Sequence, residues 1–314
     1  MNTLTEVAKE YISIRRALGF DLRYTARTLL QFVAFLDRKG APFITTSLAL
    51  RWAQEKPDAS STTQADRLSM VRRFAIWRSA TDPRTEIPAS ALLPRRYQRP
   101  TPHIYGEDEI LRIITCAASL PSARGLRGPT CSTLFGLLGV SGMRVGEAVA
   151  LDRDDVDLRT GVLSIRRGKL GKSRFIPIHS TTRDVLEIYS KRRDAIQETL
   201  ATPAFFVSDR GRRMTQWSAQ DNFAKVSRAI GLRPPATGRF GHGPRLHDLR
   251  HRFAVSTLIH WYRSGADVER EIPKLATYLG HNSPNEVYWY LQAVPELLQL
   301  ATQRSEHVAK GGAS

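Results

Sequence analysis

Residues 245–254 read RLHDLRHRFA, a stretch that places two histidines and an arginine within about one turn of an expected helix. His247 and Arg250 are three residues apart and therefore share a helix face, and His251 lies one turn after His247. This spacing arises often by chance, and taken alone it indicates a histidine that packs in the core or caps the helix. Four other segments of the chain change that interpretation.

These segments supply further basic residues and a tyrosine. They read GVSGMRVGEAVAL at 139–151, GKLGKSRFIPI at 168–178, YLGHNS at 278–283 and VYWYL at 287–291. An arginine presents a rigid fork of donors and stays charged, so two arginines can bind the non-bridging oxygens of one phosphate and offset charge in the transition state. The set is typical of a site in which a tyrosine attacks a phosphodiester; in chain order it is Arg144, Lys169, His247, Arg250, His281 and Tyr290.

The tyrosine and the leaving group both need proton transfer. A tyrosine hydroxyl has a pKa of about 10, so it becomes a good nucleophile only near cations and beside a histidine that accepts its proton. The departing alkoxide needs a proton, which a lysine on a hairpin can donate, and Lys169 and Lys172 both lie in such a turn. Considered one by one, these residues have ordinary interpretations: a surface ion pair for Arg144 and a solvated turn for the lysines.

With these motifs in this order, the chain resembles the tyrosine recombinases, also called the phage integrase family. The resemblance covers residues 106–308, whereas residues 1–100 resemble the family's helical DNA-binding domain in pattern only. It implies Arg144 and Arg250 as the phosphate-binding arginines, Lys169 as the general acid on the 5′ oxygen, His247 as the histidine of the H-x-x-R motif, His281 as the second histidine, Tyr290 as the nucleophile, and Glu147 and His251 as supporting residues.

The nucleophile is not unique on inspection. Tyr288 lies two residues before Tyr290, with Trp289 between them. Tyr290 is nine residues after His281, and this spacing matches the family's nucleophile. The sequence therefore favours Tyr290 and leaves Tyr288 as the alternative.

The resemblance also implies a reaction and its partners. The tyrosine forms a 3′-phosphotyrosine and releases a 5′-hydroxyl, and a 5′-hydroxyl from a partner strand reverses the step. The bond energy stays in the protein–DNA link, so we expect no cofactor and no metal. The implied partner is double-stranded DNA, bound at two sites by a homotetramer or by a tetramer with related recombinases. The Arg-rich composition and the VYWYL region favour the integration or excision of a mobile element.

The net charge of +17 points to the same partner from independent evidence. A solvated surface needs no such excess of one sign, and a polyanion, above all nucleic acid, explains it best. The excess is about equal in residues 1–100 and in the remainder, so we expect both parts to face the polyanion. The alternative is a proteome that is merely rich in arginine.

Cysteine content and hydrophobicity indicate the cellular compartment in which the protein works. Cys116 and Cys131 are the only cysteines, too few for a disulfide scaffold or a cysteine-rich zinc site. The chain shows no apolar run of membrane-spanning length and no signal-peptide layout at its N-terminus. These features predict a cytoplasmic protein that associates with the nucleoid and not with a membrane.

The sequence predicts two domains that form a clamp around DNA. Residues 1–90 carry four helix-like stretches, residues 91–105 are a Pro- and Arg-rich linker, and residues 106–314 form the catalytic domain. We expect a mainly α-helical fold with a small antiparallel β-sheet in the catalytic domain, its strands at 156–167 and 174–178. The residues predicted to meet DNA phosphates are Arg67, Arg72, Arg73 and Arg78 on the fourth helix, and Arg95 and Arg96 in the linker.

Other functions share parts of this pattern. A non-catalytic DNA-binding protein on the same fold would not need the complete basic set or the tyrosine. A type IB topoisomerase shares the chemistry but acts as a monomer, and the bipartite layout and the GKLGK hairpin favour a recombinase. An RNA-processing phosphodiesterase is more distant, because it needs no phosphotyrosine.

Overall fold

The computed structural model describes residues 3–95, 101–166, 173–196, 202–235, 243–281 and 283–311. The chain divides into two compact units, residues 1–100 and 101–314, and this division falls inside the linker predicted at 91–105. Lys169 and Arg96 lie outside the described residues. Within the described part of the chain, every helix is too short or too polar to cross a membrane.

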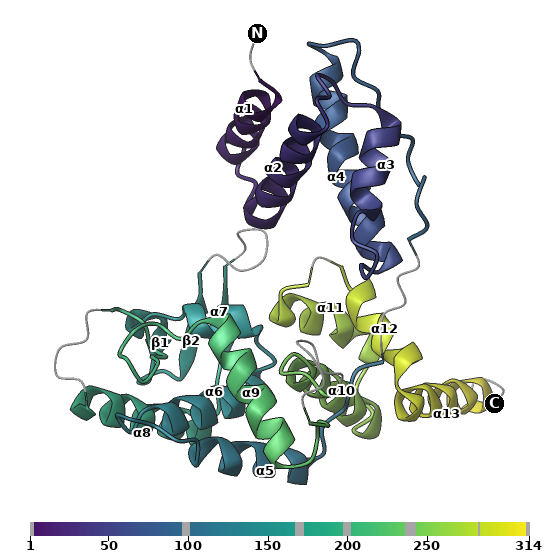
Figure 1. Ribbon diagram of the computed structural model, residues 1–314. Coiled ribbons are helices and arrows are strands. Elements are labelled where there is room, and N and C mark those ends of the chain that lie inside the picture. The colour runs from purple at the N-terminus through teal and green to yellow at the C-terminus, as the bar shows by residue number, and fades with distance from the viewer. Residues whose placement is uncertain are drawn as a thin grey trace. The chain divides into compact units, whose positions relative to one another are not determined.

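The first unit is a bundle of helices (Figure 1). Its elements are α1 (Leu4–Ala17), α2 (Arg23–Arg38), α3 (Thr46–Gln54) and α4 (Ser61–Ser79). Each helix turns an apolar stripe inward, and aromatic side chains fill the centre, where Phe32 packs on Trp52 and Tyr11 packs on Phe74. The hydroxyl oxygens of Thr45 and Ser60 cap α3 and α4, because each accepts a hydrogen bond from a backbone N–H group in the first turn of its helix.

The basic residues of α4 do not share one environment. Arg73 is exposed, whereas Arg72 donates to the carbonyl of Pro88 and Arg78 pairs with Asp82 at 3.3 Å. Arg95, which follows the helix, pairs with Asp66 at 3.1 Å and remains largely exposed.

The prediction that Arg67 faces a DNA phosphate is corrected by the structure. Arg67 is only 6% exposed, and its guanidinium donates to the carbonyl of Trp52 at 2.6 Å and lies 4.0 Å above the indole ring. The guanidinium is occupied inside the helical bundle, and burial lowers its pKa. Arg67 is therefore a core residue of the first unit.

The second unit is mainly helical and carries one small sheet. Its elements are α5 (Glu107–Ala118), α6 (Arg127–Ser141), α7 (Val145–Ala150), η1 (Arg153–Asp155), β1 (Val156–Asp157), β2 (Val162–Ile165), β3 (Arg174–Pro177), α8 (Ser180–Ile196), α9 (Gln216–Ala229), α10 (Asp248–Arg263), α11 (Val268–Leu279), α12 (Asn285–Ala293) and α13 (Pro295–Gly311). The strands pair antiparallel in the order β1-β2-β3. The predicted fold class, mainly α with a small antiparallel sheet, is confirmed.

One predicted strand is wrong in its extent. The segment 156–167 is not a single strand, because a tight turn separates β1 from β2. The Asp157 carboxylate accepts hydrogen bonds from the backbone N–H groups of Arg159 and Thr160, and Gly161 adopts the left-handed region with φ 68°. The side chain of Asp157 thus supplies the turn that strand alternation alone does not indicate.

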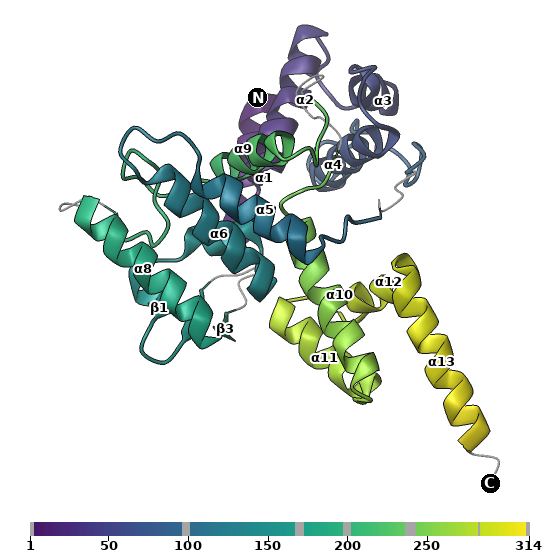
Figure 2. The same ribbon diagram turned by 90° about the horizontal axis from the view of Figure 1, so that it is seen from below.

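The buried helix α6 organises the second unit. Every residue on it from Thr130 to Leu138 is buried or half-buried, and α5, α8 and α10 all pack against it. A side chain at Gly128 would bring its Cβ 2.2 Å from the carbonyl oxygen of Ala118, so the close approach of α5 and α6 requires glycine there. Beside this core, α10, α11, α12 and α13 gather around a second apolar cluster that includes Leu258 and Tyr290 (Figures 1 and 2).

The two arginines of α4 provide a matched test of the correction above. We expect Arg67→Ala to lower the free energy of unfolding by about 1.5–3 kcal/mol, the range for a lost hydrogen bond from a charged group. The exposed Arg73→Ala on the same helix should change it by less than about 0.5 kcal/mol. Urea unfolding followed by tryptophan fluorescence measures both, and equal effects would contradict a core role for Arg67.

Candidate active site

Arg144 sits where α6 turns into α7. α6 ends at Ser141 and is capped by Gly142, which takes the left-handed conformation with φ 59°; a Cβ on Gly142 would lie 2.5 Å from Phe253. Two residues later Arg144 is the N-cap of α7, and its backbone N–H donates to Glu147 Oε2 at 3.0 Å. The turn and this hydrogen bond thus fix the backbone position of Arg144 independently of its side-chain contacts.

Glu147 binds two arginines at once. Its Oε1 accepts hydrogen bonds from Arg144 Nη1 at 3.0 Å and from Arg174 Nη1 at 3.1 Å, and its Oε2 accepts from Arg174 Nη2 at 2.8 Å. The carboxylate is only 7% exposed. Burial raises the pKa of Glu147, but the hydrogen bonds and charges of Arg174 and Arg144 outweigh burial, so the pKa is lowered overall. Glu147 therefore stays ionised at neutral pH.

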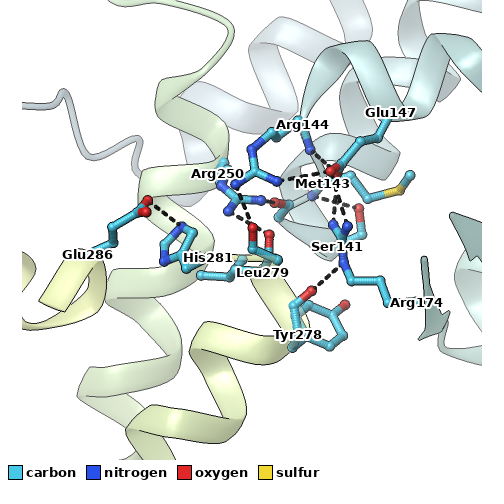
Figure 3. A network of polar contacts seen from close by, with 12 residues as sticks. Ser141, Met143, Arg144, Glu147, Arg174, Arg250, Tyr278, Leu279, His281 and Glu286 are labelled. Carbon is cyan, nitrogen blue, oxygen red and sulfur yellow. Dashed lines mark hydrogen bonds and ion pairs between the residues drawn. The ribbon is translucent and has the colours of Figure 1, made fainter. Parts of the chain in front are cut away.

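Three arginines bind three successive carbonyl groups at the end of α11 (Figure 3). Arg174 Nε donates to the oxygen of Tyr278 at 2.7 Å, Arg250 Nη2 to that of Leu279 at 2.8 Å, and Arg144 Nη2 to that of Gly280 at 2.9 Å. The last carbonyls of a helix have no partner within the helix and carry its negative dipole end, so cations satisfy them well. These hydrogen bonds join three elements that are far apart in the sequence, α7, β3 and α10, to the C-terminal end of α11.

Gly280 makes this convergence possible. It adopts φ 67°, and a Cβ there would lie 2.9 Å from Arg174 Nη1 and 3.3 Å from Arg144 Nη1. His281 follows Gly280, and its backbone N–H donates to the carbonyl oxygen of Ala276 at 2.8 Å. This hydrogen bond holds the backbone of His281 against the end of α11. His281 Nε2 lies 3.8 Å from Glu286 Oε2 at the start of α12.

Arg250 ties α10 to the α6–α7 turn. Its Nη1 donates to the oxygen of Gly142 at 2.8 Å, and the residue is 3% exposed. Burial first and the charge of Arg144 second lower the pKa of Arg250 to about 10, while Tyr290 and Glu147 act in the opposite direction. Arg250 remains cationic at neutral pH. Within the described residues, these hydrogen bonds engage two of the five side-chain N–H groups on Arg144 and two on Arg250.

His247 stands at the start of α10, next to this cationic group. His247 is exposed, yet desolvation by the surrounding protein and then the charge of Arg250 lower its pKa to about 4. His247 is therefore neutral at physiological pH. Its ring meets that of His251 edge to face, with centroids 4.8 Å apart.

The two tyrosines of VYWYL differ sharply. Tyr290 is 1% exposed and its hydroxyl oxygen lies 2.6 Å from His251 Nδ1, whereas Tyr288 is 40% exposed. Tyr290 belongs to the apolar cluster of α10–α13 through its ring and reaches the polar site through its hydroxyl.

The structure places Arg250 and Arg144 on the neighbouring carbonyl groups of Leu279 and Gly280, directly before His281, and Arg144 also pairs with Glu147. His247 is the N-cap residue of α10, on which His251 contacts Tyr290 of α12. Lys169 lies outside the described residues, between β2 and β3 in the sequence. The sequence reasoning missed Arg174. Its signal was present: Arg174 starts the strand that follows Lys169 in the same motif, on the same side of the strand as the buried Ile176.

Comparisons with known proteins agree on one family. A profile described as "Phage integrase family" matches residues 106–296. The protein named "Putative integrase/recombinase y4rB" from Sinorhizobium fredii (strain NBRC 101917 / NGR234) is 46% identical over 310 residues, covering 98% of each chain. "Tyrosine recombinase XerC" of Mycobacterium leprae (strain TN) is 29% identical over 270 residues, covering 86% of this chain and 84% of that protein. Among solved structures, a lambda integrase tetramer bound to a Holliday junction shares the fold with a TM-score of 0.60 at 21% identity, covering 91% of this chain and 79% of that one.

The shared carboxylate predicts a pH-dependent loss of stability. We expect Glu147→Ala to lower the free energy of unfolding by about 3–5 kcal/mol, because two largely buried guanidinium groups lose their counter-charge. Glu147→Gln, which keeps the shape, should cost less. The folded-state pKa of Glu147 is lowered, so its contribution is fully present above its unfolded pKa of about 4.3 and is lost as pH falls through the folded value.

Denaturant unfolding of the wild type and of Glu147→Gln between pH 7 and pH 3 measures this. The difference between them should be constant above about pH 5 and shrink below about pH 4, the range that follows from the unfolded carboxyl pKa. A difference that does not change with pH would mean that the charge of Glu147 adds no stability.

Proposed function

The chain belongs to the phage integrase family and is a tyrosine site-specific recombinase, and on this premise we propose that it cuts and rejoins DNA through a 3′-phosphotyrosine formed by Tyr290. The observation that carries the proposal is the set of guanidinium groups gathered at the end of α11, beside a tyrosine whose hydroxyl contacts a histidine. A DNA-binding protein without turnover has no need of this arrangement.

Arg144 and Arg250 are the proposed phosphate-binding residues. Their guanidinium groups are fixed in advance by Glu147 and by backbone carbonyls, so little reorganisation is needed when charge builds on the phosphate oxygens. Arg174 is the proposed positioning residue of this pair, because it fixes the same carboxylate and the same helix end. His247 and His281, which follows Gly280, are the other two residues proposed to contact the phosphate. Lys169 is the proposed general acid on the 5′ oxygen.

In each step of the proposed reaction one phosphoester bond is broken and another is formed. As the Tyr290 oxygen bonds to the phosphorus, its proton passes to a histidine of the site. The bond from phosphorus to the 5′ oxygen breaks, Lys169 protonates that oxygen, and the strand leaves with a 5′-hydroxyl. A 5′-hydroxyl from another strand reverses the attack and frees Tyr290. The energy of the phosphodiester is retained throughout, so the chemistry needs no nucleotide hydrolysis.

The first unit is proposed to hold the duplex through its accessible arginines. Arg73 and Arg95 are exposed and Arg72 and Arg78 are partly so, and a helix bearing several cations can bind successive phosphates. Arg96 is included from the sequence alone, and Arg67 is excluded because it is buried. Residues 1–90 and 106–314 then act as the two DNA-binding domains, joined by the linker at 91–105.

The assembly and the biological role follow by analogy. The lambda integrase structure is a tetramer on a Holliday junction, and we propose that four protomers of this chain act on two DNA sites. We further propose a role in the integration or excision of a mobile element, in the cytoplasm at the nucleoid. The similarity to the integrase/recombinase from Sinorhizobium fredii supports a recombinase over a type IB topoisomerase.

Covalent capture in cells tests the function and the nucleophile together. Cells that express the protein are lysed in hot detergent, and the DNA still attached to it is recovered and sequenced. We expect adducts clustered at one repeated sequence, present in Tyr288→Phe and absent in Tyr290→Phe. Adducts that vanish only in Tyr288→Phe would move the nucleophile, and the absence of adducts even on nicked substrates would favour the non-catalytic DNA-binding protein.

Arg144→Ala serves as the matched control of that experiment. It keeps Tyr290 but removes a donor to the phosphate, so adduct formation should fall by roughly 10²–10³-fold, as for one lost transition-state donor. Undiminished adducts in Arg144→Ala would remove this arginine from the proposed site.

A further inference from the structure

His251 contacts the proposed nucleophile directly. The Nδ1 atom of His251 on α10 lies 2.6 Å from the hydroxyl oxygen of Tyr290 on α12, and the two residues are 39 positions apart in the chain. Both are buried, with 5% and 1% of their surface exposed. A hydrogen bond of this length between buried groups holds both side chains in one orientation.

The surroundings of His251 decide which way the proton points. Its other ring nitrogen, Nε2, lies 4.0 Å from Oδ1 of the buried Asp248. Asp248 is itself held in place, because its carboxylate accepts the backbone N–H of Arg245 at 2.7 Å and Arg245 Nη2 at 3.0 Å. This separation is too long for a hydrogen bond, but the negative charge of the carboxylate favours a proton on Nε2. In that tautomer Nδ1 accepts and the Tyr290 hydroxyl donates.

A carboxylate, an imidazole and a hydroxyl in this order form an arrangement that activates a nucleophile. The carboxylate stabilises the imidazolium that forms when the imidazole takes the proton of the hydroxyl. The neutral ring of His247 and the indole of Trp289 also face His251, with ring centroids at 4.8 and 6.0 Å. Neither of these rings adds a positive charge against the forming imidazolium.

We propose that His251 is the general base of the reaction, a step beyond the supporting position that the family resemblance gives it; this inference rests on the proposed function. As the Tyr290 oxygen bonds to phosphorus, the O–H bond breaks and the proton moves to His251 Nδ1. The bond from phosphorus to the 5′ oxygen breaks, and that oxygen takes its proton from the general acid. On rejoining, the imidazolium of His251 returns the proton to the tyrosine oxygen.

The same contact admits an opposite role with an opposite consequence. If the hydrogen bond only holds Tyr290 in an idle position, its removal speeds cleavage. If His251 accepts the proton, its removal slows cleavage. The sign of the change therefore separates the two roles.

The test measures the single-turnover rate of adduct formation on a nicked duplex that carries the DNA sequence recovered by covalent capture. We expect His251→Ala to slow the rate by roughly 10²–10⁴-fold, the usual contribution of a general base. Added imidazole should restore part of the rate, since it can occupy the vacated space and accept the proton. His260→Ala is the matched control on the exposed side of the same helix, and should keep the wild-type rate without a response to imidazole.

A second variant and a second measurement keep the test valid if His251→Ala fails to fold. His251→Gln keeps a hydrogen-bond acceptor for Tyr290 but cannot take a proton, so it should fold, remain slow and show no recovery with imidazole. In the free protein, the ¹⁵N NMR signal of His251 Nδ1 should be that of an unprotonated acceptor and should shift in Tyr290→Phe.

The outcomes distinguish this inference from the function on which it rests. If the wild type forms no adduct, the proposed function fails. If the wild type forms adducts and His251→Gln forms them at the same rate or faster, only the role of His251 is overturned. A Nδ1 signal typical of a protonated nitrogen would overturn it as well.

Discussion

The candidate site depends on how the protein keeps three guanidinium groups together against their mutual repulsion. Arg144, Arg174 and Arg250 all bind within three successive residues of the α11 end, and the charge of Arg144 contributes to the lowered pKa of Arg250. The Glu147 carboxylate supplies a full negative charge to two of them, and the carbonyl groups of a helix end supply partial charges to all three. The remaining surplus of positive charge is what the proposed site offers to a phosphate group.

This arrangement also determines where Tyr290, the proposed nucleophile, lies. β3, α7 and α10 are fastened to the end of α11, and the chain continues from there through His281 into α12, which carries Tyr290. α10 contributes both Arg250 to the arginine group and His251 to the tyrosine. The proposed phosphate-binding residues and the proposed nucleophile therefore all contact α10 or the end of α11, so a shift of α11 relative to α10 would alter both.

The sequence predicted the helices from apolar periodicity and most of the site from short motifs whose residues lie close together in the chain. It failed where a partner is distant. Arg67 follows the apolar stripe of Val71 and Phe74 at helical spacing, but only the fold shows that Trp52 offers it a carbonyl and a ring. Arg174 looked like an ordinary strand residue because its partners Glu147 and Tyr278 are 27 and 104 positions away. The contact of His251 with Tyr290 joins residues 39 positions apart on α10 and α12, and no local pattern encodes it.

The most direct test of this account is the crystal structure of Tyr290→Phe bound to its captured DNA site. The account predicts that the scissile phosphate lies within hydrogen-bond distance of the guanidinium groups of Arg144 and Arg250, and that both still donate to the carbonyls of Gly280 and Leu279. The phenyl ring that replaces the Tyr290 side chain should face the phosphorus on the side opposite the 5′ oxygen. A phosphate that contacts neither arginine, or one that is approached by Tyr288, would contradict it.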